Sequence, residues 1–285
     1  MTTEKKGHTP KDGHYARLRR QYRDSDSERT GAATRPKQGT KPPHLPADGL
    51  VRLYGLHTVR AALDNPSRAI RRMLVTRNAL GRLALSEPLA LPFPAEIVEP
   101  RALGKILGSD AVHQGVLIEA EPLKAKRLSA LGDTRLVLVL DQVTDPHNVG
   151  AIMRSAVAFG AGALITTSRH SPSESGVLAK SASGALEHID HIEVRNLADA
   201  IGELHEAGFQ TVGLDSDGPA RLEKTFSGEK IALVLGAEGK GLRQKTRDTV
   251  SALARLDMPG IIRSLNVSNA AAIAMYAARS HLDQD

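Results

Sequence analysis

The fold is decided by residues 255–279, which read Arg255-Leu-Asp-Met-Pro-Gly-Ile-Ile-Arg-Ser-Leu-Asn-Val-Ser-Asn-Ala-Ala-Ala-Ile-Ala-Met-Tyr-Ala-Ala-Arg279. A short apolar run leads into a Pro-Gly loop, and the helix that follows has a start crowded by Ser264, Asn266, Ser268 and Asn269. One polar residue is enough to cap a helix, so four of them indicate a functional loop. The alanines that follow permit close packing of this helix against a protein interface or a cofactor.

A second segment has the same order of strand, loop and helix. It reads Asp141-Gln-Val-Thr-Asp-Pro-His-Asn-Val-Gly-Ala-Ile-Met-Arg154, and we expect Asn148 to cap the helix and Arg154 to lie six residues further on. An asparagine and an arginine near a helix start suit a hydroxyl, a phosphate or a ribose. A capped helix with a surface arginine is the simpler alternative.

A third segment, Gly236-Ala-Glu-Gly-Lys-Gly-Leu242, follows the apolar run at 231–235. Its glycines can adopt positive φ angles and let backbone amides approach a ligand closely. The simpler alternative is a tight turn with a solvated Glu238. The loop lacks the glycine patterns of dinucleotide-binding folds and of phosphate loops, so it favours neither NAD nor ATP.

Apolar runs alternate with helical patterns from Arg135 onward, at 136–140, 163–167, 189–194, 211–215, 231–235 and 254–258. Runs that are apolar on both faces and separated by helices predict a parallel sheet covered on both sides. Ligands of such sheets bind at the carboxyl ends of the strands, where all three loops begin. We therefore expect an α/β domain over 135–285 in which the three loops form one pocket.

Composition excludes several classes of protein. The 285 residues are 41% hydrophobic, which is enough for about two domains. No apolar run is long enough to span a membrane, and the N-terminus lacks an apolar signal core, so we expect a cytoplasmic protein. The absence of cysteine excludes disulfides and thiolate sites. His188 and His191 lack further ligands at metal spacing, so no metal site is expected.

The chain divides into a tail, a small module, a linker and the large domain. Residues 1–48 carry +5 of the net charge of +6 and are too polar to bury a core, so we expect them to be disordered. They are either a solubilising extension or an arm that contacts nucleic-acid phosphates. Residues 51–120 predict an α/β module, with helices at 58–63 and 102–107 and strands at 72–76, 95–99 and 115–120. Residues 121–134 read as a linker.

Three stretches together resemble a known family. Asp145-Pro-His-Asn-Val-Gly-Ala-Ile-Met-Arg154, Leu235-Gly-Ala-Glu-Gly-Lys-Gly-Leu242 and Met258-Pro-Gly-Ile-Ile-Arg-Ser-Leu-Asn-Val-Ser268 resemble the ordered motifs of the SpoU/TrmH family of S-adenosylmethionine-dependent RNA 2'-O-ribose methyltransferases, of the SPOUT class. Residues 51–120, with Tyr54-Gly-Leu-His-Thr-Val-Arg-Ala-Ala-Leu63 and His113-Gln-Gly115, are similar to the substrate-binding domain of its RlmB-like branch. That branch modifies a guanosine in large-subunit ribosomal RNA.

The resemblance covers about residues 51–281 and implies more than the pattern alone could predict. It implies a SPOUT-type parallel sheet with a C-terminal trefoil knot, a small L30e-like N-terminal domain that binds RNA, and a homodimer with S-adenosylmethionine in the knot. General rules of chain connection argue against knots, so this expectation comes from the resemblance only. Methyl transfer from a sulfonium to a hydroxyl requires no metal.

The resemblance also implies two groups of site residues. The cofactor contacts are Leu235, Gly236, Ala237, Leu256, Met258, Ser264 and Leu265. The catalytic group comprises Arg154 nearest the 2'-hydroxyl, with Asn148, Glu238 and Asn266 orienting the ribose and the loops. Because an arginine is normally protonated, we expect Arg154 to act by charge and position rather than as a general base.

Three alternatives stay open at this point. The substrate could be transfer RNA, although the added N-terminal module favours ribosomal RNA. The chain could be a non-catalytic RNA-binding assembly factor, although Asn148, Arg154, Glu238 and Asn266 are all present. A dehydrogenase is disfavoured because the dinucleotide fingerprint is missing.

Overall fold

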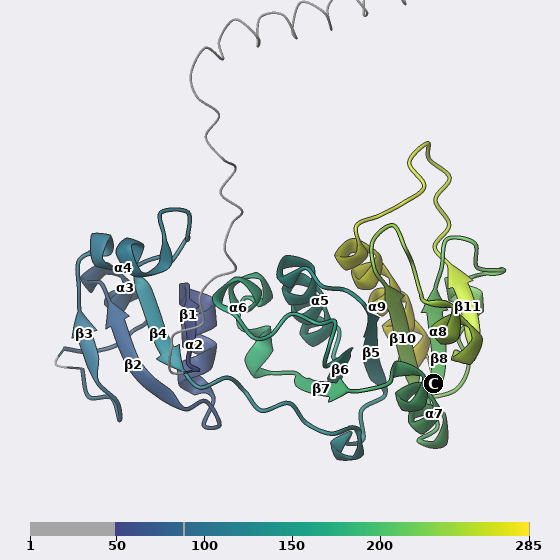
Figure 1. Cartoon of the computed structure of the whole chain (residues 1–285), viewed down its shortest axis with the longest axis horizontal. Helices are drawn as coiled ribbons and strands as arrows, with labels where there is room; N and C mark the ends of the chain where they lie inside the picture. Colours follow the sequence, from purple (N-terminus) through teal and green to yellow (C-terminus); the bar gives the residue numbers. More distant parts are fainter. Residues whose placement is uncertain (1–48, 88, 285) are drawn as a thin grey trace, which may run out of the picture. The chain divides into compact units, whose positions relative to one another are not determined.

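The computed structural model of the chain describes residues 49–87 and 89–284, which form two sheets (Figure 1). The predicted tail at 1–48 lies outside the described residues. None of the helices within the described ranges is long and apolar enough to cross a membrane.

The first sheet has four strands in the order β1-β4-β2-β3. Strand β4 pairs antiparallel with β1 and β2, while β2 and β3 are parallel. Its strands and helices are β1 (Val51–Tyr54), α2 (Leu56–Asp64), β2 (Ile70–Val75), α3 (Arg77–Arg82), β3 (Ala95–Ile97), α4 (Pro100–Leu107) and β4 (Val116–Ala120). The sequence did not predict β1, because a four-residue strand with two buried residues, Val51 and Leu53, is too short to show a period.

The second sheet has seven strands in the order β7-β6-β5-β10-β8-β11-β9, and every pair of neighbours is parallel. Its strands are β5 (Leu136–Asp141), β6 (Ala163–Thr167), β7 (Asp190–Val194), β8 (Gln210–Leu214), β9 (Ala220–Arg221), β10 (Ile231–Gly236) and β11 (Ala252–Arg255). The accompanying helices are α5 (Pro146–Ala158), α6 (Gly176–Ala182), α7 (Leu197–Glu206), α8 (Gln244–Thr249) and α9 (Val267–Leu282), with short 3-10 turns at η1 (Leu128–Ala130), η2 (Ala185–Glu187) and η3 (Leu222–Lys224).

The seven-stranded sheet is buried on both faces, as the apolar runs predicted. Along β5, Leu136, Leu138 and Leu140 pack into one core cluster together with α5 and α9. Val137 and Val139 point the other way, into a cluster with α7. This alternation is the expected result of a strand that has helices on both sides.

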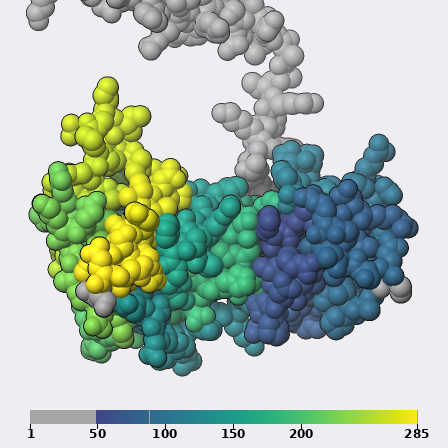
Figure 2. All heavy atoms as spheres, turned by 180° about the vertical axis from the view of Figure 1, so that it is seen from behind, coloured from purple at the N-terminus to yellow at the C-terminus, as the bar shows by residue number. Residues whose placement is uncertain are grey.

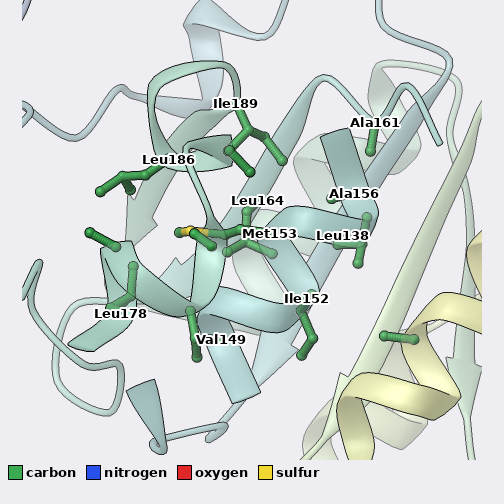
Figure 3. Close-up of a cluster of buried hydrophobic side chains, with 14 of the residues drawn as sticks. Leu138, Val149, Ile152, Met153, Ala156, Ala161, Leu164, Leu178, Leu186 and Ile189 are labelled. Atoms are coloured by element: carbon green, nitrogen blue, oxygen red, sulfur yellow. The ribbon is translucent and has the colours of Figure 1, made fainter. Parts of the chain in front are cut away.

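Helices α5 and α6 pack especially closely (Figure 3). Ile152 and Met153 of α5 are buried there together with Leu178 of α6. Gly150 of α5 lets the two helices come this close. A Cβ atom on it would lie 2.5 Å from the Leu178 carbonyl oxygen and 2.7 Å from the Ser181 Cβ, both in α6. Full burial of each large apolar side chain contributes about 1.5–3 kcal/mol, so this contact fixes α6 against α5.

Helix α9 is tied to α5 at both ends. At its start, Asn266 donates a hydrogen bond to the Asn148 side chain. Near its end, Arg279 donates from Nε to the Phe159 carbonyl at 3.0 Å and from a terminal nitrogen to the Gly160 carbonyl at 3.1 Å. These bonds satisfy carbonyls at the C-terminus of α5. The two helices therefore run in the same direction, and α9 sets the position of the loop that precedes it.

Several predicted boundaries differ from the observed ones by one to three residues, and two of these differences affect the site. The strand expected at 254–258 is β11 and ends at Arg255, because its pairing with β9 ends there and the following residues turn away into the loop. The helix expected to begin at Asn148 is α5 and begins at Pro146, with Asp145 as the cap. Asp145 accepts a hydrogen bond from the His147 N–H at 3.0 Å, and proline is favoured at the first helical position. The Asn148 side chain is thereby released for other contacts.

Candidate active site

Asn266 connects the three predicted loops at the carboxyl edge of the parallel sheet. Its Nδ2 donates to Asn148 Oδ1 at 3.0 Å and to Glu238 Oε1 at 2.8 Å. Its Oδ1 accepts from the Ser268 N–H at 2.8 Å and from the Ser268 hydroxyl at 2.6 Å. A primary amide has two N–H groups and one carbonyl oxygen with two lone pairs, so its full hydrogen-bonding capacity is used. Asn266 therefore caps α9 and joins the other two loops at once.

The group of Asn148, Glu238 and Asn266 remains accessible from solvent. Asn148 is half-buried in the first turn of α5, and the other two residues are exposed. Glu238 uses one carboxylate oxygen for the Asn266 amide, and within the described part of the chain its Oε2 has no hydrogen-bond partner. A carboxylate oxygen and an amide oxygen held side by side can accept hydrogen bonds from two neighbouring hydroxyl groups.

The loop after β10 folds back on itself. The Gly241 N–H donates to the Ala237 carbonyl at 2.9 Å, and Gly239 and Gly241 both have positive φ angles. A Cβ atom on Gly236 would lie only 2.1 Å from the Gly241 carbonyl carbon. Glycine is therefore required at position 236, and the fold of the loop presents Glu238 toward Asn266.

A buried carboxylate that sequence reasoning missed anchors the same loop. Asp141 ends β5, is fully buried and lies opposite Gly236 in the strand register. Its Oδ2 accepts from the Arg243 N–H at 3.0 Å and its Oδ1 from the Arg243 Nε at 2.6 Å. The signal in the sequence was a charged residue at the end of an apolar strand, where burial requires a partner.

Arg154 lies apart from the other three predicted catalytic residues. It is exposed on α5, and within the part of the chain that the structure describes it forms no hydrogen bond or ion pair. A separation of six residues from Asn148 places the two side chains about 120° apart around the helix, given about 100° per residue. The structure thus brings together three of the four residues and leaves the arginine charge available to a ligand.

A hollow of about 170 Å³ lies at the ends of β8 and β11. Its lining is formed by Leu214, Asp215, Ser216, Leu256, Met258, Arg263, Ser264, Leu265 and Ala270. Four of the seven residues predicted to bind a cofactor belong to this lining, namely Leu256, Met258, Ser264 and Leu265. The other three, Leu235 to Ala237, lie at the end of the neighbouring strand β10 and in its loop.

The lining combines apolar walls with hydroxyl, carboxylate and guanidinium groups, the last from Arg263. Leu256, Met258 and Leu265 supply apolar surface, while Ser264 and Asp215 supply a hydroxyl and a carboxylate. Asp215 was not predicted, and it is fixed by an ion pair with Arg247 of α8. Pockets for small molecules usually measure about 300–1,000 Å³, so this hollow of about 170 Å³ accommodates only part of a ligand of that size.

The segment between β11 and α9 projects from the surface (Figure 2). It carries Ile261 and Ile262, which are 101% and 76% exposed. On α9 itself, Ile273 and Tyr276 are 45% and 64% exposed. Large apolar side chains at such exposures, gathered on one loop and its helix, are typical of a surface that meets another molecule.

A second hollow, of about 720 Å³, is lined by residues that include Glu121, Glu174 and Glu187, together with Val149 and Met153 of α5. Two of these carboxylates hold the buried Arg68 side chain, with contacts of 2.6 Å to Glu174 and 2.5 Å to Glu187. Burial raises the pKa of Glu174, while the Arg68 charge opposes that shift. The surplus of acidic groups there makes an anionic ligand unfavourable.

The described residues contain no cluster of three or more histidine, cysteine or acidic side chains placed to hold a metal ion. His191, considered above as a ligand, instead shares a hydrogen bond of 2.9 Å between its Nε2 and the Thr166 hydroxyl. Burial lowers the pKa of His191.

Comparison with known proteins identifies two family models in the chain. Residues 135–276 match the SpoU rRNA Methylase family, and residues 52–125 match the model for RNA 2'-O ribose methyltransferase substrate binding. A protein of Ralstonia nicotianae named 23S rRNA (guanosine-2'-O-)-methyltransferase RlmB is 37% identical over 237 residues, covering 79% of this chain and 94% of that protein. A protein of Pseudomonas putida with the same name is 34% identical, with coverage of 80% and 96%.

Solved structures agree with these sequence matches. An AdoMet-bound rRNA methyltransferase from Sinorhizobium meliloti is 25% identical, with a TM-score of 0.69 and coverage of 82% of this chain and 88% of that one. The SpoU methyltransferase AviRb from Streptomyces viridochromogenes, in complex with the cofactor AdoMet, is 21% identical. Its TM-score of 0.69 over 82% of this chain and 91% of that chain shows a common fold.

Proposed function

Because this chain belongs to the SpoU rRNA methylase family, we propose that it transfers the methyl group of S-adenosylmethionine to the 2'-hydroxyl of a guanosine in 23S ribosomal RNA. One observation in the structure carries the proposal. Asn266 holds the side chains of Asn148 and Glu238 together at the edge of the sheet, next to a hollow with apolar walls. The shared name of relatives aligned over nearly their whole length supports the substrate.

The residues around the hollow fit the cofactor. S-adenosylmethionine supplies a methyl group that its sulfonium makes electrophilic. Leu256, Met258 and Leu265 would lie against its apolar parts, and Ser264 would bind polar atoms, while the backbone of Leu235–Ala237 would bound the site on the β10 side. Asp215 adds an acceptor for hydroxyl groups. AdoMet-bound relatives with the same fold support this assignment.

We assign the catalytic work to position and charge. Glu238 and Asn148 would accept hydrogen bonds from the ribose hydroxyls, and Asn266 would hold those two acceptors in place. The unpaired positive charge of Arg154 would stabilise negative charge that develops on the 2'-oxygen, or bind the adjacent phosphate. Alignment of the hydroxyl with the methyl group supplies a large part of such a rate enhancement. The methyl group is already activated, so the proposed reaction needs no metal.

The proposal includes a trefoil knot in the methyltransferase domain, assigned to 135–285. Two contacts support it: the segment after β11 returns to lie against both Asn148 and Glu238, and α9 then packs beside α5 rather than beside β11. The four-stranded domain at 51–120, with 121–134 as the linker, is proposed to be an L30e-like RNA-binding domain. The match of residues 52–125 to a substrate-binding model supports that role.

The proposed working state is a homodimer in the cytoplasm. The exposed apolar side chains of Ile261, Ile262, Ile273 and Tyr276 support a second copy as the partner of α9 and its loop. The proposed substrate, ribosomal RNA, supports the cytoplasm as the location.

The test is methyl incorporation from labelled S-adenosylmethionine into unmodified 23S ribosomal RNA and, separately, into transfer RNA, followed by nucleoside analysis. We expect 2'-O-methylguanosine in 23S RNA. Label in transfer RNA alone would show that transfer RNA, and not 23S ribosomal RNA, is the substrate. Absence of label from both RNAs and from isolated ribosomal particles, with cofactor bound, would overturn the catalytic assignment in favour of an assembly factor.

A further inference from the structure

A single ammonium group is held where loops of the N-terminal domain meet α6. The Nζ atom of Lys180, on α6, donates to Gln114 Oε1 at 2.7 Å, and the same oxygen accepts from the Leu56 N–H at the start of α2 at 3.1 Å. Gly55 leaves the space for it, because a Cβ atom there would lie 2.5 Å from the Lys180 Nζ and 2.9 Å from its Cδ. Two segments of the N-terminal domain, at Gly55–Leu56 and at Gln114, thus surround this lysine.

The loop that carries Gln114 adopts a costly backbone conformation. Gln114 has a φ of 54° and the following Gly115 a φ of 85°. Gly115 is also held by its neighbours, since its N–H donates to His113 Nδ1 at 3.0 Å and its carbonyl accepts from the Thr76 N–H at 2.8 Å. A residue other than glycine in the left-handed region costs about 1–3 kcal/mol and persists where surrounding contacts enforce it, commonly at functional sites. In this conformation the Gln114 amide oxygen lies 2.7 Å from the Lys180 Nζ.

The charge of Lys180 is not neutralised by the protein. No carboxylate of the described residues forms an ion pair with it, whereas Lys126 is paired with Asp190 at 2.6 Å. Burial of part of the side chain lowers the pKa of Lys180, so the protonated form would gain from a nearby anion. Its hydrogen bond to Gln114 uses one of three N–H donors and leaves two for a ligand.

Contacts of neighbouring residues connect this lysine to the candidate active site. Ser181, the next residue on α6, shares a hydrogen bond of 3.2 Å with His147 Nδ1. His147 in turn precedes Asn148 in the first turn of α5, and Gly150 allows α5 and α6 to touch at this level. Figure 1 shows α6 between α5 and the first sheet. Lys180 is therefore next in sequence to the α6 residue that contacts the first turn of α5, where Asn148 lies.

We propose that Lys180, positioned by Gln114, binds a backbone phosphate of the substrate RNA close to the nucleotide that is methylated. The inference rests on the proposed function and adds a binding residue outside the three loops. A lysine supplies a compact point charge that suits a phosphate oxygen. Gln114 fixes where that charge lies relative to the N-terminal domain, so the contact would set the register of the RNA between the two sheets.

The competing explanation is a purely structural tie between the N-terminal domain and α6. The two explanations differ in their dependence on salt. Loss of a phosphate contact reduces the slope of log affinity against log salt by about 0.7–0.9, because one fewer counterion is released. Loss of a hydrogen bond inside the protein lowers stability and leaves that slope unchanged.

The experiment measures binding of a 23S RNA fragment over a salt series for the unchanged protein and three variants. Lys180→Gln removes the charge but keeps a group that can donate a hydrogen bond. Gln114→Asn keeps a residue that tolerates positive φ but shortens the side chain. Lys230→Gln is the matched control, since Lys230 also donates to a neutral oxygen, the Ala207 carbonyl at 3.4 Å, but lies at the amino end of β10. Cofactor affinity and melting temperature verify folding.

We expect Lys180→Gln to weaken RNA binding about tenfold and to lower the salt slope by about 0.7–0.9. Gln114→Asn should weaken binding less and keep the slope, and Lys230→Gln should match the unchanged protein. A Lys180→Gln variant with the original slope, or a control with the same loss, overturns the inference. Methyl transfer is measured in the same samples. Absence of transfer by the unchanged protein, with isolated ribosomal particles as substrate as well, overturns the proposed function, whereas transfer without an effect of Lys180 on RNA binding overturns only the phosphate contact.

Discussion

Replacement of Asn266 should separate helix capping from the assembly of the site. Asn266→Ala removes four hydrogen bonds, two to Ser268 and one each to Asn148 and Glu238. Loss of a helix cap costs about 1 kcal/mol. The remaining bonds are exposed and are replaced by water, so they add little, and we expect a total of about 1–2 kcal/mol. Asn266→Ser restores the cap, because serine accepts from the same N–H, but its single hydroxyl cannot reach both loops.

The two variants should therefore agree in activity and differ in stability. With about 2–4 °C of melting temperature per kcal/mol for domains of 150–250 residues, Asn266→Ala should melt about 5 °C lower and Asn266→Ser close to the unchanged protein. Misplacement of aligning groups by about 1 Å can cost about 100-fold in rate, and we expect a loss of that order in both variants. Scanning calorimetry and single-turnover methyl transfer to 23S RNA, both with saturating cofactor, give the two quantities.

The result that refutes this reasoning is recovery of full turnover in Asn266→Ser together with recovery of stability. In that case the cap alone would matter, and the bridge between Asn148 and Glu238 would have no catalytic role.

Three further predictions concern charge. Arg154→Lys should lose most turnover while cofactor affinity, measured by calorimetry, stays the same; near-full turnover would exclude the proposed role of its guanidinium. Arg68→Met should lower the melting temperature by on the order of 10 °C, since breaking a buried ion pair costs about 3–5 kcal/mol. Glu187 would remain buried, and among the described residues the Asn65 amide is the partner that would be left to it. An unchanged melting temperature would contradict this. Burial lowers the pKa of His191, so below about pH 6.5 the folded state binds fewer protons than the unfolded state. The free energy of unfolding should therefore fall as the pH drops from about 6.5 toward the pKa of His191 in the folded state. Denaturation curves at several pH values should show that the free energy of unfolding falls as the pH drops, and that it falls less steeply in His191→Gln. The same pH dependence in both proteins would count against this prediction.

Much of the second sheet could be predicted from the sequence, because its strands are buried on both faces. The run at 163–167 became β6 without a change of boundary, and the run at 136–140 became β5 with one residue added. The end of β11 was missed because Leu256 and Met258 are apolar for another reason. They line the hollow rather than extend the strand, and apolar character alone does not distinguish these roles.

Convergence of the loops was predictable, whereas their contacts were not. The rule that ligands bind at the carboxyl edge of a parallel sheet was enough to group the three loops, whereas the choice of Asn148, Glu238 and Asn266 within them came from the family resemblance. The partners of Asp141 and Lys180 depend on residues 102 and 66 positions away. A single sequence contains no local signal for such pairs, because they arise only when separate elements pack together.

The ties between α5 and α9 have a consequence for when the protein becomes active. Asn266 must reach Asn148, which was synthesised 118 residues earlier, before Glu238 is held in place. Arg279 must also reach the far end of α5 before α9 is fixed there. A nascent chain that has left the ribosome only as far as β11 therefore carries all seven strands of the second sheet but an incomplete site. The ribosome that makes this protein would not be exposed to its activity until α9 has emerged and docked.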